Sequence, residues 1–93
     1  MLIHEVGGAG LREGVPGQRD RILRDGAIPA KYKLLMTMIV DALQSHPDGV
    51  ANIATRARAA GASEAEIQEA VEVAYLFGGT PALLTAINAF RTP

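Results

Sequence analysis

The sequence contains no cysteine among its 93 residues. A chain without thiols forms no disulfide of its own, holds no metal through thiolates and has no cysteine nucleophile. Tryptophan is also absent and aromatic residues make up only 4% of the chain, whereas hydrophobic residues make up 48%. A large apolar share with few bulky rings is typical of closely packed helices. We therefore expect an all-α protein that carries out no thiol chemistry of its own.

A surplus of charge is missing as well, because nine Lys and Arg residues balance ten Asp and Glu residues to give a net charge of −1. Proteins that bind nucleic acid or an anionic membrane surface carry a basic surplus, so we expect neither partner. The local cluster of Arg19, Arg21 and Arg24 is interpreted as a solvated helix face. The first residues, MLIHEV, lack the basic head of a secretion signal, and uninterrupted apolar runs are shorter than a membrane span. These features predict a cytoplasmic protein.

A chain of 93 residues is long enough for one small domain. Glycine and proline are concentrated in residues 1–17, which we expect to form a flexible arm, and residues 18–93 are expected to form a single helical domain. The glycines of the arm do not form a dinucleotide-binding loop, because Glu13 stands where the third glycine would be required.

About five helices are expected in the domain. The first spans about residues 18–24, and the second runs from Pro29 to about Gln44. Between residues 34 and 40 the second helix is apolar almost all round, so it lacks a polar face. A monomer of this size leaves much of its surface exposed, so this pattern predicts that neighbouring subunits cover the helix.

The next three helices carry signals at their ends. Ser45 is expected to cap one helix, with Asp48 as the acid of a capping box and Gly61 as its end. Ser63 and Glu66 repeat the capping-box pattern, and that helix is expected to end at residues 78–79, where two glycines stand together. A last helix follows over about residues 80–90.

Three motifs in this order resemble the carboxymuconolactone decarboxylase family, which includes the alkylhydroperoxidase D-like proteins. They are DGAIPAKYK from Asp25, GASEAEIQEA from Gly61 and GGTPA from Gly78. The resemblance covers about two-thirds of the chain. It implies a small all-helical fold that assembles as a homo-oligomer, a trimer or a hexamer, with a pocket between helices near the subunit contacts.

In the peroxidase branch of that family the active motif is Cys-x-x-Cys-x-x-x-His, with a glutamate twelve residues before the first cysteine. By resemblance, the two cysteine positions fall on His46 and Gly49, the histidine on Ile53 and the glutamate on Leu34. A thiol peroxidase needs a thiolate and a second, resolving thiol, so this activity is disfavoured. The decarboxylase branch lacks the cysteines but usually keeps the histidine, so Ile53 departs from that pattern too.

His46 is the candidate catalytic residue, because it is the only imidazole in the resembling region and can act as a general acid or base. Lys31 and Lys33 are candidates for holding a substrate carboxylate, and Asn52 is a candidate for orienting the substrate. Each of these residues also has an ordinary interpretation, as a helix-start residue or as a solvated polar group. His4 stands alone in the arm, so no metal site is expected, and no cofactor fingerprint is present.

Two functions therefore stay open. The first is an oligomeric protein that binds or transforms a small organic molecule without redox chemistry, by lyase-type or isomerase-type proton transfer at His46. The second is a catalytically silent relative that serves as a binding or assembly module. A site filled by Leu34, Ile53 and their neighbours would favour the second. A peroxidase that borrows a cysteine from a partner is a third interpretation without support in the sequence.

Overall fold

The computed structural model describes residues 15–91, which are helical with no strand. Four α-helices are followed by one short 3-10 helix: α3 Val15–Leu23, α4 Ala30–Leu43, α5 Pro47–Ala59, α6 Glu64–Ala86 and η1 Ile87–Phe90. The predicted all-α class is confirmed. A flexible arm is expected over residues 1–17. Residues 1–14 of this arm lie outside the described residues, whereas residues 15–17 form the start of α3.

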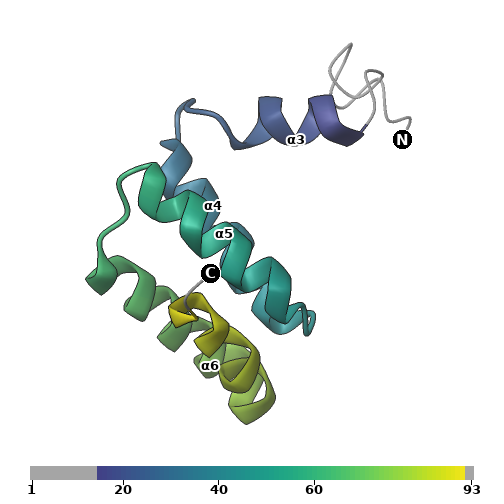
Figure 1. The fold of residues 1–93 in the computed structure, drawn as a ribbon, viewed down its shortest axis with the longest axis vertical. Coiled ribbons are helices and arrows are strands. Elements are labelled where there is room, and N and C mark those ends of the chain that lie inside the picture. Colours follow the sequence, from purple (N-terminus) through teal and green to yellow (C-terminus); the bar gives the residue numbers. More distant parts are fainter. Residues whose placement is uncertain (1–14, 92–93) are drawn as a thin grey trace.

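The helices α4 and α5 lie side by side and run in opposite directions, because only residues 44–46 separate them (Figure 1). α6 packs against α4, and η1 brings the chain back against α5. α3 extends to one end of the molecule and packs mainly against α4 (Figure 1). The domain is therefore built around the α4–α5 pair.

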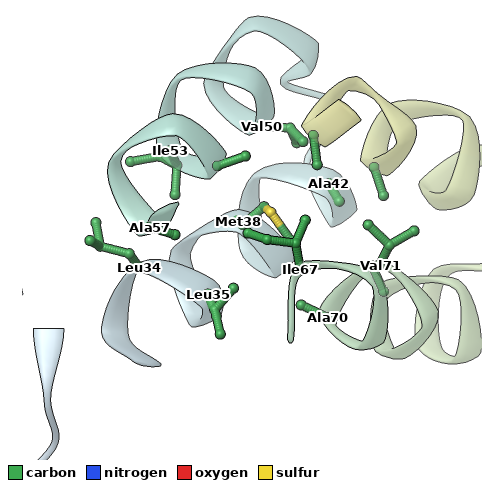
Figure 2. Close-up of a cluster of buried hydrophobic side chains, with 14 of the residues drawn as sticks. Leu34, Leu35, Met38, Ala42, Val50, Ile53, Ala57, Ile67, Ala70 and Val71 are labelled. Atoms are coloured by element: carbon green, nitrogen blue, oxygen red, sulfur yellow. The ribbon is translucent and has the colours of Figure 1, made fainter. Parts of the chain in front are cut away.

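The core lies where α4, α5 and α6 meet. Its largest fully buried side chains are Met38, Ile67 and Val50, one from each of these helices (Figure 2). Alanine fills many of the other positions, among them Ala54 and Ala57 of α5, so the helix backbones approach closely. This packing explains why so apolar a sequence contains so few aromatic residues.

The end of α6 contains the break that the paired glycines predict. Gly79 has φ 71° and ψ −162°, a conformation that side chains other than glycine rarely adopt, and Pro81 follows it. The helical run is therefore interrupted at Gly79, as predicted, and resumes to Ala86, so α6 contains the expected fourth helix and the start of the expected fifth on either side of a kink. The predicted capping box is confirmed, because Ser63 and Glu66 each accept a hydrogen bond from the other's backbone N–H.

The predicted cap at Ser45 is wrong. The residue before α5 is His46, which makes no side-chain capping bond, and Pro47 occupies the first turn. Ser45 instead ends α4 with φ 62°, where its N–H donates to Ala42 and the N–H of His46 donates to Asp41. This pair of hydrogen bonds is the Schellman motif, and it satisfies carbonyls at the end of α4.

One described stretch, Glu64–Phe90, is long and apolar enough to cross a membrane when judged by length and composition alone. Ile67, Val71 and Ala74 of this stretch lie in the domain core. Packing within the domain therefore accounts for part of its apolar character.

Candidate functional site

His46 lies on the surface at the start of α5. Its side chain is 55% exposed, and its Nδ1 atom lies 3.1 Å from Oδ1 of Asp41. Within residues 15–91, that carboxylate is the hydrogen-bond partner of the imidazole, and Nε2 is not bonded. A half-exposed imidazole held at one nitrogen can accept or donate a proton at the other.

Gly49 lies directly beside this pair. A Cβ atom at position 49 would stand 2.8 Å from Oδ2 and 3.0 Å from Cγ of Asp41, and 3.3 Å from Cβ of His46. Carbon atoms do not approach oxygen atoms this closely, so a larger residue would displace the carboxylate. Of the two positions that correspond by resemblance to the family's cysteines, one therefore carries the imidazole and the other leaves room for its partner.

A second polar contact lies at the same end of α5. Arg91, just after η1, donates from its guanidinium to Oδ1 of Asp48 at 2.9 Å. Both side chains are largely exposed, so this ion pair contributes little to stability. The carboxylate of Asp48 stands two residues after His46, and the ion pair brings the cation of Arg91 to the same end of α5.

The two remaining motif positions are part of the core. Leu34 is 4% exposed and Ile53 is 3% exposed, and both belong to the buried cluster shown in Figure 2. Neither side chain carries a group that can move a proton. The interior positions matching the family's glutamate and histidine are thus filled with packed aliphatic side chains.

Lys31 lies near the start of α4 and pairs with Glu66 of α6, with Nζ 3.3 Å from Oε2. The hydrogen bond to Glu66 raises the pKa of Lys31, and burial opposes that effect. The pKa of Glu66 is lowered, mainly by the hydrogen bond from the backbone N–H of Ser63 and further by Lys31. Lys31 thus joins the start of α4 to the capping box of α6.

Lys33 donates hydrogen bonds to the backbone carbonyls of Ile22 and Arg24, at 2.9 and 3.0 Å. These carbonyls lie at the end of α3, where a cation also interacts favourably with the helix dipole. Lys33 therefore fastens α3 to α4.

The structure does not bring the four predicted site residues together. Lys31 precedes Asp41 by ten residues on α4, which corresponds to about 15 Å along the helix axis. Asn52 is exposed and stands six residues after His46, about 9 Å along α5. His46 and the two lysines thus lie at opposite ends of α4.

Two surface hollows lie elsewhere on the domain. The larger, of about 390 Å³, is bordered by α3, α4 and α5 and has Leu34, Arg24 and Arg56 in its lining. The other, of about 310 Å³, lies between α4 and α6 with an apolar floor and Glu66 and Glu69 in its lining. His46 lines neither of them. Across residues 15–91, no three His, Asp or Glu side chains gather closely enough to share a metal ion.

The comparison with protein families decides what kind of chain this is. The model of the carboxymuconolactone decarboxylase family matches residues 13–92. The chain belongs to this family. Comparisons with curated proteins and with solved structures gave no match. The family match confirms the prediction made from the three sequence motifs. The chain is a member of this family that has no cysteine.

Sequence reasoning missed Asp41 and Arg91. Asp41 is the only acid in α4 and precedes His46 by five residues, a spacing that a Schellman turn brings together. The sequence offers the spacing but no glycine at position 45 to announce the turn. Arg91 lies 43 residues from Asp48 along the chain, so no local spacing signals their contact.

Proposed function

We propose that this family member binds a small organic molecule at the start of α5 and transforms it by non-redox proton transfer, with His46 as the general acid and base. The observation that supports this proposal most directly is the setting of the imidazole. It is half exposed, and Asp41 holds it through a single nitrogen. In the proposed step a C–H bond of the substrate breaks and its electron pair stays on the substrate as an enolate. The proton forms a new N–H bond on His46 and is returned to another atom, as in an isomerase or a lyase.

In this proposal a second copy of the chain completes the pocket over His46, because the residue lies on an open surface of the single chain. The protein is proposed to be a cytoplasmic homo-oligomer, a trimer or a hexamer. Exposed apolar side chains on α4 and α6 support this assembly, among them Met36, Val40, Leu76 and Phe77. Lys31, Lys33 and Asn52 stay candidates for substrate contact only if a neighbouring subunit brings them near a partner's His46.

The test is proton exchange. The family's name points to carboxylated lactones as the first compounds to incubate with the protein in D₂O, with deuterium incorporation followed by NMR. We expect His46→Ala to abolish exchange and His4→Ala, which alters the chain's other histidine, to leave it intact. Full activity of His46→Ala on any substrate found would contradict the proposal.

A catalytically silent binding or assembly module is the second candidate. The burial of Leu34 and Ile53 favours it, because a packed core fills two of the four motif positions. Wild-type protein that assembles but exchanges no proton with any compound tested would support this function over the first. Peroxide turnover by the purified chain alone would contradict both, since the chain has no thiol to oxidise.

A further inference from the structure

Asp41 and His46 are joined twice, once through the backbone and once through their side chains. The N–H of His46 donates to the carbonyl of Asp41 at 2.9 Å, as part of the Schellman turn that ends α4. The imidazole Nδ1 lies 3.1 Å from Oδ1 of the same residue. The backbone bond fixes the two Cα positions, so the side-chain contact does not depend on a flexible loop.

The side-chain contact fixes which nitrogen carries the hydrogen. An ionised carboxylate only accepts hydrogen bonds, so the atom that faces it must donate. With Asp41 ionised, the contact requires the hydrogen on Nδ1, and the neutral imidazole then has its lone pair on Nε2, the nitrogen without a partner. A free imidazole favours the opposite tautomer, with the hydrogen on Nε2.

We propose that Asp41 is a positioning residue that holds His46 in the Nδ1-protonated tautomer, so that Nε2 is the proton acceptor, and that Gly49 provides the room for this pairing. The inference rests on the proposed function of His46 and specifies which of its atoms reacts. When Nε2 takes a proton from the substrate, the carboxylate of Asp41 also faces the resulting imidazolium and stabilises it.

Gly49 is the second part of the arrangement. A methyl group at this position would stand 2.8 Å from the carboxylate oxygen that does not bind His46. Alanine would therefore push the carboxylate away from the imidazole without replacing either Asp41 or His46. The variants Asp41→Ala and Gly49→Ala thus test one contact from opposite sides.

The experiment is ¹⁵N-detected NMR of the imidazole in the full-length, ligand-free protein. His4→Gln is introduced throughout, so that His46 gives the only histidine signals. At a pH where the ring is neutral, we expect the parent protein to show hydrogen mainly on Nδ1. Asp41→Ala and Gly49→Ala should both invert the tautomer ratio in favour of Nε2–H. Asp48→Ala removes a carboxylate two residues away that pairs with Arg91, and it should leave the ratio unchanged.

Hydrogen mainly on Nε2 in the parent protein overturns the proposal, whichever variants fold. The same holds if Asp41→Ala and Gly49→Ala keep a helical circular dichroism spectrum and leave the ratio unaltered. Because no substrate is present, this readout is independent of activity. Full activity of His46→Ala would contradict the proposed function without affecting the tautomer result. Hydrogen mainly on Nε2 would contradict only the proposed role of Asp41.

Discussion

Glu66 accepts hydrogen bonds from two separate parts of the chain. The backbone N–H of Ser63 donates to it at 2.8 Å as part of the capping box, and Lys31 reaches it from α4. Both donors favour the ionised carboxylate and lower the pKa of Glu66. A group with a depressed pKa in the folded state stabilises the fold above its ordinary pKa and loses that contribution as the pH falls through the folded value.

We therefore expect Glu66→Gln to lower the free energy of unfolding at pH 7, and the difference from wild type to shrink as the pH falls below about 4, the ordinary glutamate range. Urea denaturation at pH 7, 5 and 3 measures this difference. Glu69→Gln, on the exposed side of the same helix, is the matched control and should show no such trend. If Glu66→Gln lowers the free energy of unfolding equally at all three pH values, the charge of Glu66 is not responsible for the effect.

Among single side chains, the sequence points to His46 as a candidate but does not identify its partner, Asp41. The imidazole was recognisable because it is the only one in the region of family resemblance and falls on a motif position. Asp41 was not, because its proximity depends on Ser45 adopting φ 62°, which residue type alone does not dictate. For Lys31 and Lys33, the charge suggests a substrate carboxylate, and that role stays a prediction. Their contacts with Glu66 and with the end of α3 are visible only in three dimensions.

Gly78 lies in the contact between α4 and α6. A Cβ atom at this position would stand 2.6 Å from Cδ2 of Leu43 and would also meet the Cβ of Ala82. The Cβ of Ala82 belongs to α6 itself and cannot rotate away, so a methyl group here distorts the kinked end of α6 and also displaces the Leu43 side chain of α4. We expect Gly78→Ala to destabilise the protein by about 1–3 kcal/mol, the usual range for overpacking, in spite of the gain in helix propensity.

Chemical denaturation measures this change, with Gly26→Ala as the control. A Cβ at Gly26 would meet only the flexible end of Lys33, at 3.4 Å, so the expected effect is within about 0.5 kcal/mol of zero. Equal effects of the two substitutions would contradict the proposed close contact of α4 with α6.

The ends of the helices can be predicted from capping residues and glycines wherever such a residue fits only one helix end. The capping box at Ser63 and the glycine at position 61 each match one end of a helix, and the structure confirms both. Ser45 was misassigned because α4 and α5 are joined by so short a turn that one residue can be taken as the end of the first helix or the start of the second. Pro47 fixes the outcome, since the helix begins with it and the preceding residue becomes the cap.

Within residues 15–91, several large apolar side chains on α4 and α6 are exposed. Phe77 is 76% exposed and Leu76 is 72% exposed, next to the kink of α6. We expect analytical ultracentrifugation to give the mass of a trimer or a hexamer, and the unfolding temperature to rise with protein concentration. Replacing both residues by Glu should shift the protein toward monomer, whereas Gln68→Glu, also exposed on α6, should not. A stable wild-type monomer at micromolar concentration would contradict the assembly.

The residues proposed to carry the chemistry come from one short stretch around the connection between α4 and α5. Residues 41–49 supply the carboxylate, the turn, the imidazole and the glycine that accommodates them, whereas the core is drawn from all of α4, α5 and α6. Ala42 of this stretch is itself part of the buried core, so an exchanged segment has to keep a small apolar residue there. Grafting a Cys-x-x-Cys pair into positions 46 and 49 would leave Leu34 and Ile53, which correspond by resemblance to the family's glutamate and histidine, aliphatic and buried. A cysteine pair alone would therefore not restore the complete peroxidase motif.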